Sequence, residues 1–492
     1  THLKTVLYLK GMKSVAIFGA GIAGLTAAQE LKELGYEVNL YESLPEVGGF
    51  FRSSRDPHIQ MPTEYSWHGL GPWYHNTYDI MKKIPFTLQQ NVYEAALSRP
   101  IDFGIFPNHS AAQFYDRGFR SIPKMFGMTK WEFVKWSYIM LKTWTSHNRS
   151  LKKYSKILAS EAWKGIISPQ ANDTWKSCFG PWIGSDWANV SLHTTGEFFK
   201  KQLTTKYVHK HKKDSQGKAW THTSGDGWLL LKGPSSEYWF TPWVNHLKNI
   251  GVNIHCNKPL TKLEYEGDNL TGAWVNEELI KADYYVLALN PYLLQKIMNK
   301  TPGLERLNEF KKFKPLVQSR PHVQVSFRIA FKEPIKFPRK HTAVVLSDSE
   351  FNLTLFAQEQ LWDKEVELGE GIKSLWTGTS CCSCAIGKKY NKSVSQCSKE
   401  EFIEEVKTQV LASSALNELI KEANEGKELK DFTIKHIEVW HEWNFSKRGI
   451  SGGQPKWVNT NKNQAFLPNQ TTPLNNVFLA GAHTKTQADV WS

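Results

Sequence analysis

The chain has 492 residues, of which 40% are hydrophobic and 13% aromatic, and this content suits a globular protein with two substantial domains rather than a disordered chain. Its net charge of +14 comes mostly from lysine, which favours a solvated basic surface over specific phosphate recognition and argues against nucleic-acid binding. No apolar run approaches the roughly 18–20 residues of a spanning helix, so we expect no transmembrane segment.

The first motif along the chain is a strand, a glycine-rich turn, a helix and a second strand. It consists of the apolar run 15–18, the glycines Gly19, Gly21 and Gly24, and the run 38–41 that ends at Glu42. Gly19 permits a tight turn, Gly21 lets backbone approach a pyrophosphate, and Gly24 allows close packing of helix on strand. The helix N-terminus attracts phosphate and Glu42 can accept from ribose hydroxyls. The order predicts a Rossmann-like dinucleotide-binding unit, with an ordinary glycine-rich turn as the alternative.

A glycine pair, Gly48 and Gly49, follows the acidic residue. With the first motif it resembles the FAD fingerprints of the flavin amine oxidase superfamily, which includes amine oxidases and carotene desaturases. The resemblance implies FAD, bound noncovalently because no Cys or His stands at the C-terminal motif in the context of covalent attachment. Most members carry a basic residue directly after the pair, whereas this chain has Phe50 and only then Arg52.

The stretch 62–86, PTEYSWHGLGPWYHNTYDIMKKIPF, is similar to a segment of carotene desaturase-like and hydroxysqualene dehydroxylase-like proteins that lines the flavin ring. The residues implied here are Glu64, Trp67, His68, Trp73 and Tyr74. Gly69 and Gly71 would let backbone approach the flavin edge. His68 is a catalytic candidate as a proton shuttle or a donor to reduced flavin, and its alternative is a histidine held by Glu64.

Residues 129–144 combine aromatic side chains with Lys130, Lys135 and Lys142 over the length of one helix. This composition is typical of a helix that lies at a membrane interface. A core helix of the substrate domain is the alternative, and it is the commoner role of such a segment.

A second nucleotide-fold stretch follows the middle of the chain. It predicts a helix over 238–248, a strand over 252–255, a hairpin over 264–272 and a buried strand over 284–289. In the superfamily this region lies beside the adenine and beneath the cofactor. The resemblance therefore implies contacts from Pro259, Leu260, Ala288, Leu289 and Asn290.

Amine oxidases of the superfamily carry a lysine, which holds a water at flavin N5, on a strand that precedes a Lys-Glu-Pro sequence. Counting back from Lys332 places Ser326 at the lysine position, with Gln324 and Arg328 on the same face of the strand. The missing lysine argues against a standard amine oxidase. Gln324 becomes a second catalytic candidate.

The C-terminal run 477–480 is an apolar strand followed by Gly481 and Ala482. Together with His483, Thr484 and Lys485 it resembles the last flavin-binding motif of plant-type phytoene and zeta-carotene desaturases. Trp440, Trp443 and Trp457 precede this strand. They can wall a substrate tunnel or pack in the core.

The motifs predict an α/β fold with a discontinuous, Rossmann-like FAD-binding domain (12–76, 226–300 and 470–492) and an inserted mixed α+β substrate domain (77–225 and 301–469). We expect residues 1–11 to be a leader or a cloning remnant. The full set of predicted cofactor contacts is Gly19, Ala20, Gly21, Ile22, Ala23, Gly24, Glu42, Ser43, Gly48, Gly49, Phe50, Arg52, Gly69, Pro259, Leu260, Ala288, Leu289, Asn290, Gly481 and Ala482. The substrate-lining candidates are Trp73, Tyr74, Trp440, Trp443 and Trp457.

Three functions stay open. The first is a desaturase or dehydrogenase of an apolar, isoprenoid-like substrate that passes a hydride to flavin N5, with a quinone-like acceptor and peripheral membrane contact. The second is an amine oxidase that forms imine and hydrogen peroxide, and the third is a non-catalytic flavin-binding protein. The six cysteines fit neither zinc ligation nor a disulfide scaffold, so we expect reduced thiols, no metal and an intracellular protein, soluble or peripherally membrane-associated.

Overall fold

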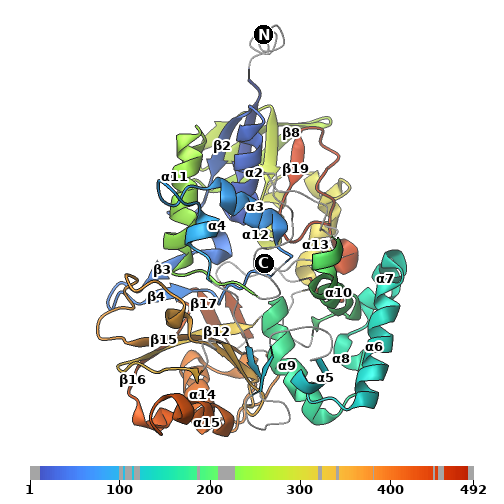
Figure 1. Ribbon diagram of the computed structural model, residues 1–492. Coiled ribbons are helices and arrows are strands. Elements are labelled where there is room, and N and C mark those ends of the chain that lie inside the picture. The colour runs from blue at the N-terminus through green and yellow to red at the C-terminus, as the bar shows by residue number, and fades with distance from the viewer. Residues whose placement is uncertain are drawn as a thin grey trace.

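The computed structural model describes most of the chain. It covers residues 12–71, 73–98, 103–105, 113–115, 122–184, 189–208, 228–319, 324–338, 343–380, 382–446, 449–452 and 459–485. The predicted leader and Trp457 lie outside these ranges. Figure 1 shows three parts: a sheet flanked by helices, a larger sheet below it, and a group of helices beside that larger sheet.

The upper part is built on a five-stranded sheet in which every neighbouring pair is parallel. Its strands, in spatial order, are β19 (Val477–Leu479), β11 (Tyr284–Leu287), β1 (Ser14–Phe18), β2 (Glu37–Tyr41) and β7 (Asn253–His255). The central strand β1 is followed by the glycine turn and by α2 (Ile22–Glu33), which leads to β2. This parallel sheet confirms the predicted α/β fold with a Rossmann-like unit.

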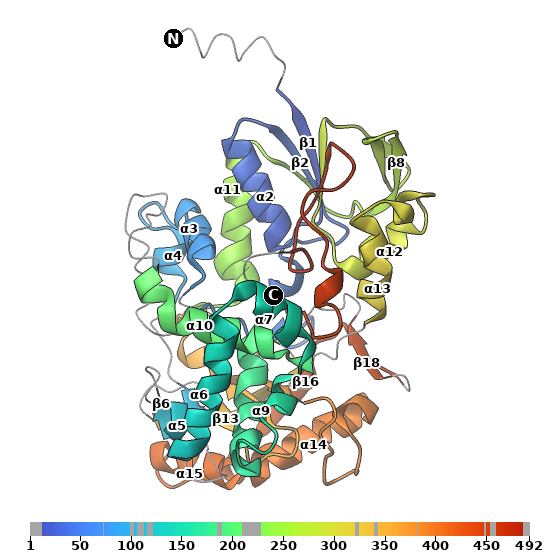
Figure 2. The same ribbon diagram turned by 90° about the vertical axis from the view of Figure 1, so that its right-hand side faces the viewer.

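Successive side chains of β1 point to opposite faces of the sheet, and each face is covered by different elements. Val15 and Ile17 pack with α2 and with α11 (Thr241–Asn249). Ala16 and Phe18 pack on the other side. That side is covered by α12 (Pro291–Met298) and by the antiparallel sheet of β8 (Leu260–Glu266), β9 (Asn269–Val275) and β10 (Glu278–Ile280). Figure 2 shows the helices and the small sheet on the two sides of the parallel sheet.

Two predicted boundaries differ from the structure. The helix predicted over 238–248 begins earlier, as the π-helical turn η6 (Ser236–Phe240) that continues into α11. The strand predicted over 284–289 ends at Leu287, because Asn290 turns the chain away from the sheet and accepts a hydrogen bond from the first turn of α12.

The lower sheet has seven strands, antiparallel except where β13 pairs with β5. Its order is β16 (Ile434–Val439), β12 (Val325–Phe331), β15 (Ser374–Ser380), β14 (Leu353–Phe356), β13 (Ala343–Leu346), β5 (Phe103–Ile105) and β6 (Gln113–Tyr115). Its strands come from the two ranges predicted for the substrate domain, and those of the parallel sheet come from the other three. The domain boundaries themselves stay a prediction.

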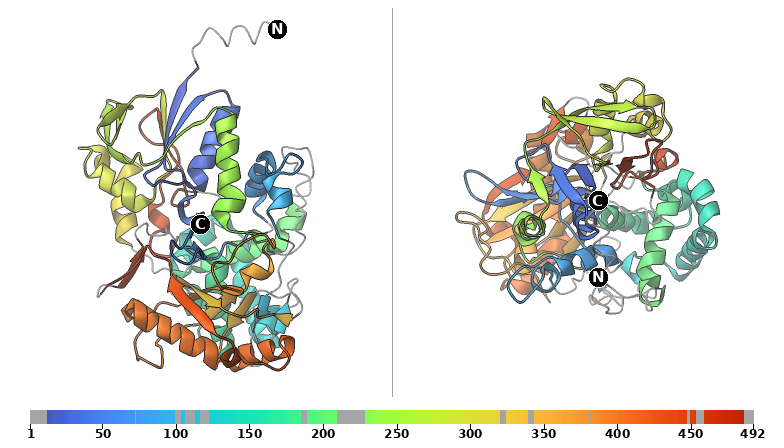
Figure 3. Two further views of the ribbon diagram at one scale, coloured as in Figure 1. Left: turned by 90° about the vertical axis from the view of Figure 1, so that its left-hand side faces the viewer. Right: turned by 90° about the horizontal axis from the view of Figure 1, so that it is seen from above.

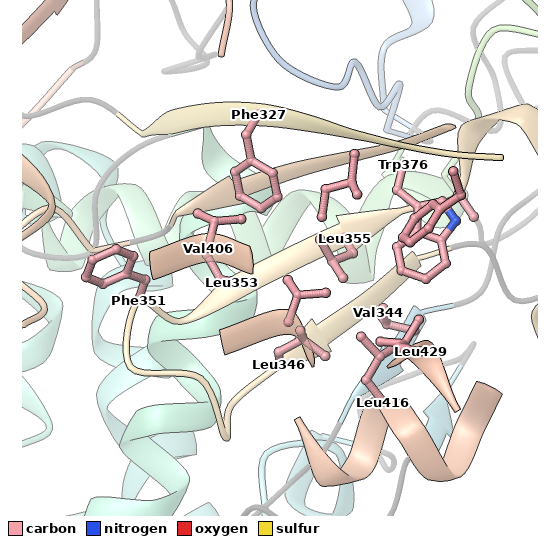
Figure 4. Packing of buried hydrophobic residues seen from close by; sticks show 14 of the residues in the cluster. Phe327, Val344, Leu346, Phe351, Leu353, Leu355, Trp376, Val406, Leu416 and Leu429 are labelled. Atoms are coloured by element: carbon pink, nitrogen blue, oxygen red, sulfur yellow. The ribbon is translucent and has the colours of Figure 1, made fainter. Parts of the chain in front are cut away.

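One face of the seven-stranded sheet is covered by α14 (Lys399–Ala412) and α15 (Ser414–Ala423), the orange helices at the bottom of Figure 3, left. Figure 4 shows Phe327, Leu353 and Leu355 of the strands packing toward Val406 and Leu416 of these helices. The odd-numbered side chains of β12 are buried in this core. Its even-numbered side chains, Ser326 and Arg328 among them, therefore point to the opposite face, toward the upper part of the molecule.

Six further helices form a lobe beside the lower sheet (Figure 1). They are α5 (Ile122–Met125), α6 (Lys130–Trp144), α7 (His147–Lys153), α8 (Ala159–Ala162), α9 (Pro169–Ile183) and α10 (Leu192–Val208). Trp136 of α6 is buried against the rings of Trp163, Trp175 and Phe199. Over the described ranges, none of the helices combines the length and apolar character needed to cross a membrane.

Between the two sheets lies the hairpin of β3 (Ser53–Arg55) and β4 (Pro62–Glu64), which follows the glycine pair. The helices α3 (His75–Lys83) and α4 (Val92–Ala95) continue the chain beside α2 (Figure 1). The segment 62–86, predicted to line the flavin, thus begins in this hairpin, contacts the lower sheet through Trp67 and returns to the upper part at α3.

Candidate functional site

The turn after β1 has the geometry that its glycines predict. Gly19 has φ +99°, and a Cβ there would stand 2.5 Å from the carbonyl oxygen of Ala288. A Cβ on Gly24 would stand 1.8 Å from the carbonyl oxygen of Gly19, so α2 packs directly on the turn. The space before Gly21 is different, because the nearest atom to an added Cβ is the Cα of Gly49 at 3.8 Å. Room for a pyrophosphate exists at this one glycine of the turn.

The glycine pair closes that space from the other side. Gly48 and Gly49 have φ +112° and +57°, and Gly48 N donates to the carbonyl of Ala20 over 2.8 Å. No side chain caps the N-terminus of α2. The N–H groups of its first turn, among them those of Ile22 and Ala23, are therefore available to an anion.

Glu42 is fixed beside the turn. Its Oε2 accepts from Ala20 N over 2.7 Å, and its Oε1 accepts from Ser43 Oγ and Leu44 N over 3.0 Å each. A carboxylate has about four acceptor positions, so ribose hydroxyls can still donate to it. The backbone of Glu42 accepts from Lys258 N over 2.8 Å. This bond draws Pro259 and Leu260 to the predicted adenine side.

The two later motifs meet the same turn. Ala288 N donates to the carbonyl of Phe18 over 2.9 Å, and the Leu289 side chain packs on Gly19. Ala480 N donates to Leu287 O over 3.1 Å, and Gly481 follows with φ +130°. The glycine turn, the glycine pair and these two later motifs therefore meet at the carboxyl ends of the parallel strands. Ala482 O accepts from Asn459 Nδ2 over 3.3 Å, and the side chain of Asn290 caps α12. The cofactor contacts predicted for Ala482 and Asn290 stay predictions.

Arg52 has protein partners in place of a phosphate. Its Nη1 donates to Gly49 O over 2.8 Å, its Nη2 is bonded to Glu442, and its guanidinium lies 5.6 Å from the ring of Trp440. Arg52 is buried, so these contacts tie the glycine pair to the segment after β16. Phe50 points toward the lower core, with its ring centroid 5.1 Å from that of Tyr65. Direct contact of either residue with a cofactor stays a prediction.

His68 and Glu64 occupy different environments. The His68 ring stacks on Phe51 at 4.0 Å between centroids. Glu64 accepts from Ser235 N over 3.2 Å and forms an ion pair with Arg328 Nη2, also at 3.2 Å. The partners of Glu64 are thus a backbone amide and a guanidinium, and the proton-shuttle role of His68 stays a prediction.

The ion pair of Glu64 and Arg328 is fully enclosed, with side chains 4% and 3% exposed. Burial raises the pKa of Glu64, and the neighbouring Arg328 opposes this shift. Nε and Nη1 of Arg328 and Oγ of Ser326 are buried with no hydrogen-bond partner among the described residues. Gln324 is buried at the start of the same face. This face of β12 therefore presents donors that a ligand can satisfy.

Aromatic rings form the wall next to these donors. The half-buried Trp73 has edge contacts at 5.9 Å to Tyr74, 5.3 Å to Phe198 and 5.3 Å to Trp228. Trp67 stacks on Phe356 of the lower sheet at 4.0 Å. The structure thus adds Phe198, Trp228 and Phe356 to the predicted aromatic set.

Gly69 and two late tryptophans also have clear positions. A Cβ on Gly69 would stand 2.2 Å from the ring of Trp67, so this glycine makes room for the indole. Trp443 stacks on Tyr65 at 4.8 Å, and its Nε1 is buried without a partner among the described residues. Trp440 covers Arg52. The substrate-lining roles of these tryptophans stay predictions.

The pairing of Arg328 with Glu64 was not predicted, although a charged residue in the otherwise apolar run VSFRIAF is a signal for a buried partner. His483 was noted only as part of a motif. It is 3% exposed beside Phe313, and burial lowers its pKa to about 4. A neutral histidine thus stands two residues after Gly481.

Comparison with known proteins identifies the family. The model for flavin containing amine oxidoreductases matches residues 22–489. The chain belongs to this family. It is therefore a flavin-dependent oxidoreductase, which favours an enzyme over the non-catalytic alternative. The open space at Gly21, the uncapped α2 and the fixed Glu42 fit a flavin dinucleotide.

Individual relatives are similar over short stretches or in fold alone. Zeta-carotene desaturase of Zea mays is 42% identical over 73 residues, which are 14% of this chain and 12% of the maize protein. The L-tryptophan oxidase RebO of Lentzea aerocolonigenes is 46% identical over 46 residues, 9% of this chain and 10% of that protein. These matches span only about a tenth of the relatives' length.

Two solved structures share the fold over almost the whole chain. Putrescine oxidase has a TM-score of 0.61 at 11% identity, covering 98% of this chain and 95% of its own. Cyclohexylamine oxidase from Brevibacterium oxydans has a TM-score of 0.57 at 15% identity, with the same coverage of 98% and 95%. At this identity the likeness concerns architecture.

Replacing Gly21 by valine should abolish flavin binding in a chain that still folds, because the added side chain enters the pyrophosphate space and meets no protein atom within about 3.8 Å. Flavin absorbance per chain after desalting measures occupancy, and a thermal melt checks folding. Gly24→Val is the matched control, and it should fail to fold because its Cβ collides with Gly19 O. Full occupancy in Gly21→Val would remove the turn from the cofactor site.

The flavin-free chain should lose stability as the pH falls from about 6.5 to about 4. Unfolded His483 takes up a proton near its ordinary pKa of 6.5, whereas the buried ring resists protonation down to about 4. The difference amounts to about 3 kcal/mol, lost across that window and constant below it. Urea midpoints at several pH values, compared with His483→Gln, isolate this contribution. Parallel pH profiles of parent and variant would contradict the assignment.

Proposed function

We propose that this oxidoreductase uses noncovalent FAD to desaturate or dehydrogenate an apolar, isoprenoid-like substrate. Ser326 carries the proposal. It stands where the amine oxidases of the superfamily have the lysine that holds water at the flavin, and a neutral hydroxyl on a buried face cannot take over the role of an ammonium group. The short similarity to zeta-carotene desaturases supports the same reading.

The aromatic wall supports an apolar substrate. Trp67, Trp73 and Trp228, together with Phe198 and Phe356, give large ring faces with few hydrogen-bonding groups. A hydrocarbon chain held against such rings is positioned by shape and burial. Bound FAD supplies the hydride acceptor, N5.

The remaining proton of a dehydrogenation needs an acceptor. His68 is the proposed group, because an imidazole nitrogen can accept a proton from the substrate. Its stacking on Phe51 fixes the plane of the ring. Glu64 and Arg328 act as positioning residues, because their ion pair ties β4 to β12.

A membrane contact follows from the outer face of α6. Trp131, Val134, Tyr138 and Leu141 stand at helical spacing on this face and are 76%, 54%, 60% and 52% exposed. Exposed cations flank them, and Lys142 Nζ lies 4.1 Å from the centre of the Tyr138 ring. Apolar and aromatic side chains bordered by lysines suit the headgroup region of an anionic bilayer. The proposed enzyme would draw its substrate there and return electrons to a quinone-like acceptor.

The alternative, an amine oxidase, is favoured by one observation. Arg328 Nε and Nη1 are buried donors without a partner among the described residues, and a pure hydrocarbon would leave them unsatisfied. A substrate with a carboxylate or carbonyl beside its amine would satisfy them. Such a substrate would be oxidised to an imine while oxygen is reduced to hydrogen peroxide.

Substrate and acceptor panels separate the two functions. With monoamines, polyamines and amino acids under air, we expect little peroxide, because Ser326 replaces the lysine. With long polyenes or isoprenoids in detergent, we expect flavin bleaching without oxygen and reoxidation by a soluble quinone. Gly21→Val serves as the inactive control. Rapid peroxide release with any amine would favour the alternative.

Flotation with vesicles tests the α6 face separately. The parent should float with phosphatidylserine-containing vesicles, and the double variant Trp131→Ser, Leu141→Ser should bind about tenfold or more weakly, since each side chain contributes about 1.5–3 kcal/mol when fully buried. Leu88→Ser, Ile386→Ser removes two exposed apolar side chains elsewhere and is the matched control. Equal flotation of all three proteins would exclude α6 as the contact.

A further inference from the structure

Two cysteines lie side by side just beyond the end of β15. The Sγ atoms of Cys382 and Cys384 are 3.1 Å apart. A disulfide bond needs a separation of about 2.05 Å, so a shift of about 1 Å joins them. Cys382 is buried, whereas Cys384 is exposed to solvent.

The backbone around the pair is held from both sides. Ala385 N donates to Cys382 O over 3.1 Å, and Ser395 N donates to Ser383 O over 3.2 Å. Val394 N then returns to Ala385 O over 3.2 Å. These bonds fix a short hairpin whose base carries both thiols. Groups held in contact in this way react as if at very high concentration.

The other described cysteines offer no comparable chemistry. Burial raises the pKa of Cys397 to about 11 and also raises the pKa of the half-buried Cys256. Both therefore stay protonated at neutral pH, and the thiolate is the reactive form. Cys178 is buried in the helical lobe. Among the described cysteines, the exposed Cys384 is the thiol that a soluble oxidant meets first.

We propose that Cys382 and Cys384 form a redox site that a small-molecule disulfide, such as oxidised glutathione, converts to an intramolecular disulfide. The Cys384 thiolate attacks one sulfur of the oxidant, and a mixed disulfide forms while one small thiol leaves. Cys382, as thiolate, then attacks Cys384 Sγ and releases the second small thiol. Two electrons pass to the oxidant, and the two protons lost by the cysteines end on the released thiols.

The site lies close to the proposed substrate face. Thr379 of β15 pairs with Ser326 of β12, and Ser380 pairs with Val325. Cys382 follows two residues later. The cysteine pair therefore lies just beyond the end of β15, the strand that pairs with β12 at Ser326. The proposed redox chemistry is independent of the substrate that the enzyme oxidises.

Peptide mapping of the full chain tests the proposal. The chain is equilibrated with mixtures of reduced and oxidised glutathione, trapped with an alkylating agent and cleaved with trypsin, which leaves residues 374–388 in one peptide. We expect this peptide to carry an internal disulfide, which removes about 2 Da relative to the two free thiols, and to carry one alkylated thiol at Cys381. We expect no disulfide-linked dimer. Cys381→Ser and the distant control Cys256→Ser should keep this internal disulfide.

Cys384 should be required for the first step, attack on the oxidant, and Cys382 for the second step, closure of the internal disulfide. Cys382→Ser should stop at a stable glutathione adduct on Cys384, and Cys384→Ser should remain reduced. Flavin absorbance and a thermal melt confirm that these variants fold. A parent chain that stays reduced in excess oxidised glutathione would overturn the proposal. So would an internal disulfide that survives in Cys382→Ser, because it would join Cys381 to Cys384.

Discussion

The buried ion pair of Glu64 and Arg328 connects the hairpin that lies between the two main sheets to the lower sheet. Glu64 ends β4, which follows the glycine turn and the glycine pair, and Arg328 lies in the middle of β12. Two charges removed from water are costly, and a buried pair is often no more stable than a well-packed apolar one. The pair instead fixes the position of β4 relative to β12, because a guanidinium has to meet its carboxylate in a definite geometry. This constraint fixes the start of the segment predicted to line the flavin against the lower sheet.

The two sides of this junction have different characters. The parallel sheet offers main-chain N–H groups and glycines, which suit the phosphates common to all flavin dinucleotides. The lower sheet and the helical lobe offer aromatic rings and a few unsatisfied donors, which suit a particular substrate. The family match itself spans both sides, since it covers residues 22–489. The names of two relatives differ in substrate, which is zeta-carotene for one and L-tryptophan for the other.

The cofactor half could be predicted because its signals are local. Gly19, Gly21 and Gly24 lie within six residues, and their spacing after an apolar strand is enough to predict the turn, although a Cβ on Gly19 would meet the distant Ala288. The pairing of Glu64 with Arg328 depends on a fold that brings distant strands together, and no short pattern encodes it. The outward face of α6 was equally hidden, since composition gives aromatic rings and lysines but the packing of Trp136 decides which side faces solvent.

The order of strands in the parallel sheet also bears on biosynthesis. Its outermost strand, β19, is formed by residues 477–479 and pairs with β11. During translation the other four strands emerge first, and the sheet is incomplete until β19 has been made. Until then β11 presents an open edge, which is a template for pairing with other chains. Such distant pairing also slows folding. From the time β11 emerges until residues 477–479 are made, a ribosome-bound chain of this protein therefore carries an unpaired sheet edge, and chaperone binding would be most useful there.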